Sequence, residues 1–233
     1  MRELAQQAEA IGIDAVFVGD HSGFDRPHGP RTEFWGGWTL LPALPEVTSR
    51  VAIDPLVTVP TLRHPVALAR MASALDEVSN GRLILGLGSA GPIERAWRML
   101  GISTERLYSR FEEAVQIIVP LLRNGVVDFH GRCFEAHEAV LGPTGPQGHT
   151  IAVWIGVKGP RMTRLAAQWA DAVSFGLPLA SNVSSSGYYD HDHQGFEEQP
   201  VGVDGGSAAT RNSRRYGNDI GELDQGDQEG GVA

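Results

Sequence analysis

The sequence has 233 residues, of which 42% are hydrophobic and 20% are charged, a composition typical of a soluble globular protein with one large or two small domains. It contains neither an apolar run long enough to span a membrane nor a signal peptide at its start, so we expect a cytoplasmic protein without membrane contact. The net charge is −9, and residues 179–233, with ten acidic residues and three arginines, carry −7 of it. No basic face remains for nucleic acid, and the single cysteine, Cys133, excludes an internal disulfide.

Strands are predicted at intervals along the first 178 residues. Short apolar runs typical of buried strands occupy residues 15–18, 51–59, 83–87, 151–155 and 172–175. The segment VVDFHGRCFEA alternates around a His-Gly pair and predicts a β-hairpin.

Helices are predicted between these strands. One begins at Pro65 and ends at an Asn-Gly cap at residues 80–81, because proline is favoured in the first turn and Asn-Gly at the end. A longer helix covers residues 104–124, where apolar side chains recur every three or four positions, and a third helix follows Pro160. Continuous apolar strands separated by helices predict an α/β fold with a parallel sheet covered by helices.

The stretch LGLGSAGPIERAW contains Gly86, Gly88 and Gly91 in the spacing G-x-G-x-x-G, which occurs in dinucleotide-binding loops. A Rossmann domain needs a further strand that ends in an acid about 20 residues later, but residues 101–124 have a helical pattern. Pro92 also suits a turn better than the interior of a helix that faces a phosphate. The glycines therefore do not predict a Rossmann domain.

Residues 179–233 have a different composition, dominated by Ser, Gly, Asp and Gln, without sustained apolar periodicity. Such a segment buries too little apolar surface to offset the entropy lost on ordering. We therefore expect a folded domain of residues 1–178 followed by a disordered acidic tail. His191 and His193 are interpreted as part of this solvated run, and no metal site is predicted.

Five segments, in this order, carry a family resemblance: AEAIGIDAVFVGDH, RHPVALARMASALDEVSNGRLILGLGSAG, RFEEAVQIIVPLL, FHGRCFEA and VWIGVKGPRMTRLAAQWADA. They resemble the bacterial luciferase-like monooxygenase superfamily over residues 3–176. The resemblance implies a (β/α)8 TIM-type barrel that binds reduced FMN or coenzyme F-420 at the carboxyl ends of its strands. Five of the family's eight strands can be identified, so we expect an incomplete barrel with two open edges, as a homo-oligomer or an aggregation-prone chain.

Candidate catalytic residues follow predicted strands, where barrel enzymes place their chemistry. Asp20 and His21 come after the first strand, and His21 is suited to hydrogen-bond a ring or substrate and to move a proton near neutral pH. A purely structural His21 stays open as an alternative. Glu94 matches the family's usual acid after the glycine-rich segment. Trp35 and Trp38 either wall a substrate cavity or, as the more common case for aromatic residues, belong to the core.

The resemblance also implies cofactor contacts. In the family, the strand that corresponds to residues 56–58 runs beneath the ring, often with a bulge or a non-proline cis peptide, and small residues such as Gly88 let backbone lie against the ring. Lys158 and the amides at the following helix start are suited to a phosphate, because both favour negative charge. Arg161 is either a further contact or only a surface charge. The predicted cofactor-binding residues are Leu56, Val57, Thr58, Gly88, Gly156, Lys158, Gly159 and Arg161.

The resemblance implies a flavin- or deazaflavin-dependent oxidoreductase or monooxygenase that acts on a small organic substrate of unknown identity. Coenzyme F-420 is slightly favoured over FMN, because KGPRM resembles the corresponding segment of F-420 users. Two alternatives stay open. One is an inactive truncated barrel fragment that serves at most as an interaction module, and the other is an unrelated α/β enzyme or nucleotide binder.

Overall fold

The computed structural model describes residues 1–20, 23–24, 32–91 and 95–175. Contacts divide the chain into two units, Met1–Pro178 and Leu179–Ala233, and every described residue lies in the first. The predicted acidic tail falls outside the described residues, as do His21 and Glu94. Among the helices in the described ranges, none is long and apolar enough to cross a membrane.

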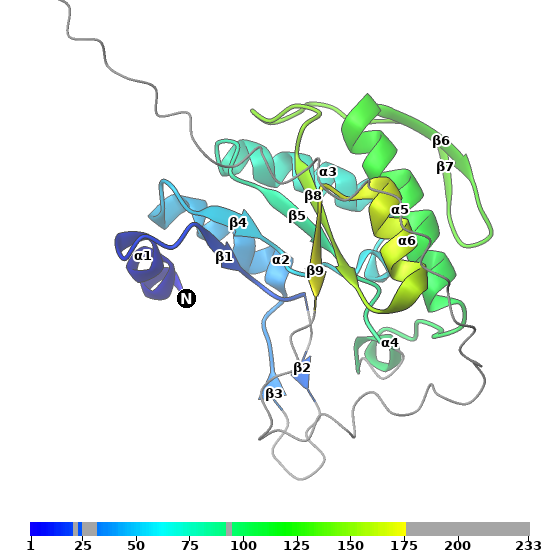
Figure 1. Ribbon diagram of the computed structural model, residues 1–233, viewed down its shortest axis with the longest axis horizontal. Coiled ribbons are helices and arrows are strands. Elements are labelled where there is room, and N and C mark those ends of the chain that lie inside the picture. The colour runs from blue at the N-terminus through cyan, green and yellow to red at the C-terminus, as the bar shows by residue number, and fades with distance from the viewer. Residues whose placement is uncertain (21–22, 25–31, 92–94, 176–233) are drawn as a thin grey trace, which may run out of the picture. The chain divides into compact units, whose positions relative to one another are not determined.

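The described part of the chain contains five parallel strands in the order β1-β4-β5-β8-β9 (Figure 1). Strands β1 and β4 pair with each other, β8 lies between β5 and β9, and parallel bridges at Ile53 and Thr58 join the β4 segment to β5. The strands are β1 (Ala15–Phe17), β4 (Ala52–Asp54), β5 (Ile84–Leu87), β8 (Ala152–Val157) and β9 (Ala172–Phe175). The predicted parallel sheet is therefore confirmed.

The apolar run over residues 51–59 is a regular strand only as far as Asp54. Pro55 has no N–H group with which to continue the strand ladder. The chain returns to β5 at Thr58, whose N–H donates to the Gly86 carbonyl at 2.7 Å. This interruption separates a short strand from a loop at its carboxyl end.

Helices and turns connect the strands, and their ends follow the local sequence. Pro65 occupies the first turn of α3, and the Nδ1 atom of His64 accepts from the Val66 N–H at 3.3 Å. Helix α5 ends at Gly125, whose φ of 77° is readily adopted only by glycine. The helices are α1 (Arg2–Ala10), α2 (Gly37–Leu40), α3 (Pro65–Val78), α4 (Arg95–Met99), α5 (Leu107–Asn124) and α6 (Gly159–Trp169), with 3-10 turns at Leu41–Ala43, Pro45–Val47 and Pro60–Leu62.

Two antiparallel pairs stand apart from the parallel strands. The predicted hairpin is confirmed as β6 (Val126–His130) and β7 (Glu135–Val140), which pack along the outer side of α5 (Figure 1). A shorter pair is formed by β2 (Gly23–Phe24) and β3 (Thr32–Glu33).

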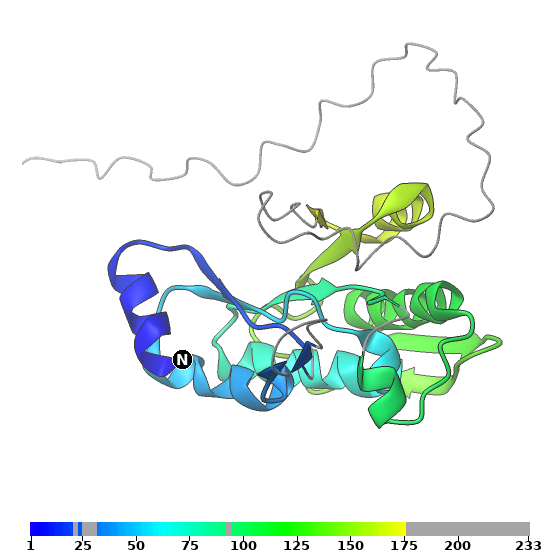
Figure 2. The ribbon, with the colours of Figure 1, turned by 90° about the horizontal axis from the view of Figure 1, so that it is seen from below.

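The core lies between one face of the strands and the helices. Figure 2 shows α2 and α3, coloured blue to cyan, in a row along this face of β1, β4 and β5. Successive strand residues point to opposite faces, so Asp54, Gly86 and Gly156 point away from this core. The core residues contributed by the strands are Ile53, Leu85, Leu87, Val153, Ile155 and Val157, and they share one buried cluster with helix residues that include Leu68, Phe111 and Ile118.

Candidate functional site

The carboxyl ends of β4, β5 and β8 converge on the side chain of Val57. A Cβ atom added to Gly88 would lie 2.9 Å from Val57 Cβ, and one added to Gly156 would lie 3.3 Å from Val57 Cγ1. Any side chain at Gly88 would therefore displace Val57, and even a methyl group at Gly156 would press on it. The structure thus brings together three of the predicted cofactor-binding residues, Val57, Gly88 and Gly156, and this cluster is called the glycine platform below.

Hydrogen bonds hold the loop that carries Val57 of the glycine platform. The Leu56–Val57 peptide bond is cis, as the family resemblance implies for this strand. Thr58 is fully buried, its carbonyl accepts from the Gly88 N–H at 2.8 Å, and its hydroxyl accepts from Trp38 Nε1 at 2.9 Å. Trp38 also packs against the core, which fits the core interpretation of this residue, whereas Trp35 is 82% exposed.

Asp20 lies at the carboxyl end of β1 and is 9% exposed. Its carboxylate accepts two hydrogen bonds from the Arg63 guanidinium, at 2.6 and 3.0 Å, and a third from the Val59 N–H at 3.2 Å. This bidentate ion pair fixes Asp20 next to the loop that follows Thr58. Its partners lie about 40 positions away in the sequence, so spacing alone could not reveal the pair.

A second buried acid, Asp54, was not identified as a candidate from the sequence. Its side chain is fully buried, Oδ1 accepts from the Gly86 N–H at 2.9 Å, and Oδ2 is buried without a hydrogen-bond partner among the described residues. Burial raises the pKa of this carboxyl to about 7, although the hydrogen bond from Gly86 opposes the shift. The signal in the sequence is a charged residue inside the apolar run VAIDPLV, where acids are rare unless paired.

The predicted phosphate contacts lie where α6 begins. Lys158 is exposed and precedes the helix, and Gly159, with a φ of 77°, is its first residue. Arg161 is committed elsewhere, because its Nε and Nη2 atoms donate to the two carboxylate oxygens of Glu112 at 2.7 and 2.6 Å. This hydrogen-bonded pair raises the pKa of the Arg161 guanidinium and joins α6 to α5.

The described residues also form a hollow of about 440 Å³ at the C-terminal ends of α5 and α6. Its lining includes Arg123, Trp169 and Asp171, and it contains none of the predicted site residues. Asp171 precedes β9 and α5 ends at Asn124, so the hollow lies at the edge opposite the carboxyl ends of the strands. The glycine platform, rather than this hollow, is therefore the candidate site.

Comparisons with known proteins identify the family of the chain. A model of the luciferase-like monooxygenase family matches residues 1–199. The F420-dependent glucose-6-phosphate dehydrogenase of Nakamurella multipartita is 31% identical over 182 residues, which cover 73% of this chain and 50% of that protein. The chain spans about half the length of the curated relatives that it matches.

Two solved structures share the fold. An F420-dependent secondary alcohol dehydrogenase in complex with an F420-acetone adduct has a TM-score of 0.64 and 24% identity, over 75% of this chain and 52% of that chain. The oxygenating constituent of 3,6-diketocamphane monooxygenase from Pseudomonas putida, in complex with FMN, has a TM-score of 0.59 and 22% identity, over 74% of this chain and 50% of that chain. These matches establish the fold of the described domain.

Proposed function

Because the chain belongs to the luciferase-like monooxygenase family, we propose that it is an oxidoreductase that binds coenzyme F-420 or FMN on the glycine platform and acts on a small organic molecule. The observation that carries this proposal is the contact of Val57 with Gly88 and Gly156. These two glycines leave room for the Val57 side chain at the strand ends, and the proposal places the flat ring of the cofactor against Val57 and the backbone around it. The relative and the two solved structures described above bind F420 or FMN according to their names, which supports both cofactor classes.

The proposed phosphate end of the cofactor lies at Lys158, Gly159 and the start of α6. The helix has 11 residues, so its first N–H groups and its dipole favour an anion. Arg161 remains a proposed contact only through N–H groups that Glu112 does not occupy. Coenzyme F-420 is preferred over FMN for this site, on the resemblance of KGPRM to F-420 users.

The sequence predicts Asp20, His21 and Glu94 as catalytic residues, and the proposal keeps His21 and Glu94 in that role. When bound, either cofactor supplies the redox chemistry, and the protein supplies binding, orientation and proton transfer. Asp20 is a positioning residue in this proposal, because Arg63 and the Val59 N–H already hold its carboxylate. His21 and Glu94 lie outside the described residues and stay proposals for proton transfer and substrate contact.

The test is a titration of the purified chain with oxidised FMN and with F-420, followed by fluorescence. We expect saturable binding of one cofactor, and at least tenfold weaker binding by the Gly156→Ala variant, whose methyl group would press on Val57. Gly142→Ala is the matched control, since a Cβ atom there meets nothing within 4 Å, and it should bind like the parent chain. Melting curves verify that both variants are folded.

The second candidate function is a barrel fragment that acts at most as an interaction module. The observation that favours it is that the chain matches only about half the length of each relative. It predicts no saturable binding of either cofactor by a chain that melts cooperatively. The two proposals therefore give opposite results in the same titration.

A further inference from the structure

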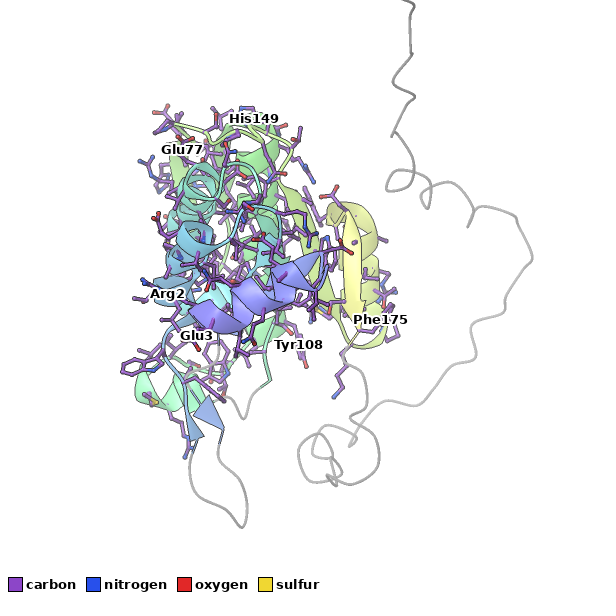
Figure 3. The ribbon with its side chains drawn as sticks, turned by 90° about the vertical axis from the view of Figure 1, so that its left-hand side faces the viewer. Arg2, Glu3, Glu77, Tyr108, His149 and Phe175 are labelled. Atoms are coloured by element: carbon purple, nitrogen blue, oxygen red, sulfur yellow. The ribbon has the colours of Figure 1, made fainter. Side chains whose placement is uncertain are left out.

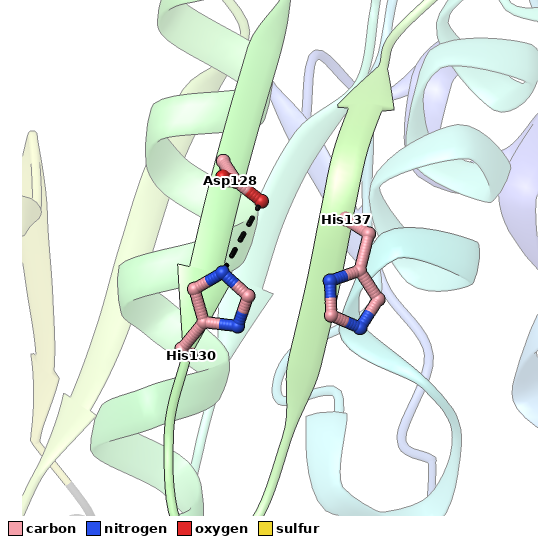
Figure 4. Close-up of side chains that lie close together, drawn as sticks. All are labelled: Asp128, His130 and His137. Carbon is pink, nitrogen blue, oxygen red and sulfur yellow. Dashed lines mark ion pairs between the residues drawn. The ribbon is translucent and has the colours of Figure 1, made fainter.

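Three side chains of types that can bind a metal ion gather on the exposed face of the β6–β7 hairpin. The ligand atoms of Asp128, His130 and His137 all lie within 4.8 Å of one another (Figure 4). The Nε2 atom of His130 is 3.8 Å from Asp128 Oδ1, and the two imidazole rings are 5.1 Å apart between centroids. All three residues are exposed, so a bound ion could be reached directly from solvent.

A β-bulge brings His137 to the same place as Asp128 and His130. The register passes from Val127 opposite Ala139 to Phe129 opposite Ala136, which leaves two residues of β7, His137 and Glu138, opposite the single residue Asp128. Glu138 has a φ of 44°, and its N–H donates to Asp128 Oδ1 at 3.3 Å. Bulges re-aim side chains, and this one directs a histidine of β7 toward the polar face of β6.

The opposite face of the hairpin is fixed to the domain. Val127 packs against the core and Ala136 is 3% exposed, because strand residues alternate between the two faces. At the hairpin tip, the Glu113 carboxylate of α5 accepts the N–H groups of Arg132, Cys133 and Phe134 at 3.0, 2.8 and 3.0 Å. The backbone that carries the three ligands is therefore held in place before any ion binds.

Sites in which three protein side chains bind a divalent transition metal such as Zn²⁺ often consist of two imidazoles and one carboxylate. Nitrogen and oxygen ligands stand about 2.0–2.2 Å from Zn²⁺, so the side chains need only small rotations to close on one ion. Glu135 Oε2 lies 3.2 Å from His137 Nε2. A carboxylate on one ring nitrogen orients the imidazole and leaves Nδ1 for the metal.

We propose that Asp128, His130 and His137 form a binding site for a divalent transition metal ion, with Zn²⁺ as its representative, and that the fourth position is open to water or a ligand. Three observations support this proposal: the bulge at His137, the burial of the hairpin face that carries Ala136, and the hydrogen bonds from the hairpin tip to Glu113. The proposal does not depend on the cofactor. The site joins the two strands of the hairpin through the ion, so binding stabilises the folded chain.

The test compares Zn²⁺ binding by the full chain and by the double variant His130→Ala, His137→Ala, using calorimetry and melting temperature. We expect Zn²⁺ to raise the melting temperature of the parent chain, and the double variant to bind at least tenfold more weakly without that rise. Glu138→Gln removes a carboxylate on the same hairpin that is not among the three ligands, and it should bind Zn²⁺ like the parent chain. Mg²⁺, which prefers oxygen ligands, should not substitute for Zn²⁺.

The two histidines at residues 191 and 193 require a separate control, because they can bind Zn²⁺ independently. The variant His191→Ala, His193→Ala should keep the binding that the hairpin variant loses. The proposal is overturned if the parent chain fails to bind Zn²⁺, or if the tail variant loses the binding and the hairpin variant keeps it.

Discussion

The two carboxyl oxygens of Asp54 differ in their hydrogen bonding. Oδ1 receives the Gly86 N–H, whereas Oδ2 is buried without a partner in the described residues. A buried carboxylate with one unsatisfied oxygen is costly, so the neutral acid is the favoured form and the pKa rises to about 7 from 3.8. In the unfolded chain the same group ionises near pH 4. The folded chain therefore holds the proton of Asp54 more tightly than the unfolded chain does. As the pH rises from about 4 to about 7, the unfolded chain loses this proton first, so the free energy of unfolding falls.

The variant Asp54→Asn should remove this pH dependence. Asparagine keeps an oxygen for the Gly86 N–H but cannot ionise, so the variant should gain free energy of unfolding relative to the parent chain as the pH rises. A shift of about three pKa units corresponds to an upper limit of about 4 kcal/mol between pH 4 and pH 8. Urea unfolding of both proteins at several pH values measures the difference. Asp14→Asn, at a fully exposed side chain, is the control and should change stability by less than about 0.5 kcal/mol.

A pH-independent difference between the Asp54→Asn variant and the parent chain would show that Asp54 ionises alike in both states. The sequence shows an acid inside an apolar run, but only the three-dimensional arrangement reveals that one of its oxygens is buried without a partner in the described residues. Its burial depends on Gly86, where a Cβ atom would lie 2.7 Å from Asp54 Oδ1. The glycine spacing of the sequence is visible, but the acid that it accommodates comes from another strand.

At the scale of elements, a single side chain of α5 holds the tip of the β6–β7 hairpin. Glu113 is half-buried and accepts three consecutive backbone N–H groups, those of residues 132–134. Hydrogen bonds to a charged group contribute about 1.5–3 kcal/mol each at most, and partial exposure lowers this value. Glu113→Gln should therefore lower the free energy of unfolding by about 1–2 kcal/mol, measured by urea titration. The exposed Glu105 provides the control, Glu105→Gln, which should change stability by less than about 0.5 kcal/mol. Equal effects of the two substitutions would contradict a supporting role for Glu113.

Elements were predictable where a local signal decides them. The strands at residues 83–87 and 172–175, both ends of α3 and the C-terminal end of α5 follow from apolar runs and from Pro, Asn and Gly. The start of α5 does not, because the predicted helix begins at residue 104 and α5 begins at Leu107. The bulge at His137 was not predictable, because it depends on the register in which β7 pairs with β6. The return of the chain to β5 at Thr58 was not predictable either, because its partner strand is distant in the sequence. The glycine platform lies between these cases. The family resemblance implied its residues, but only the structure gives the contact of Val57 with both glycines.

At the scale of the whole domain, the two outer strands of the parallel sheet present apolar side chains to solvent. Within the described ranges, β1 pairs only with β4 and β9 pairs only with β8. The exposed fractions are 51% for Phe17, 41% for Val173 and 67% for Phe175, which is labelled in Figure 3. An apolar strand edge with unpaired N–H and C=O groups is a template for pairing with another chain.

We therefore predict that the purified chain associates with itself through β1 and β9. Light scattering after size exclusion should give a mass above the 25.0 kDa of one chain, or the protein should be recovered mainly as aggregate. The double variant Phe17→Ser, Phe175→Ser removes apolar surface at both edges and should shift the mass toward the monomer. Leu4→Ser is the control, because Leu4 is 68% exposed but lies on α1 rather than on a strand edge, so it should leave the association unchanged. A parent chain that is a monodisperse monomer and melts in one cooperative transition would contradict association through these edges.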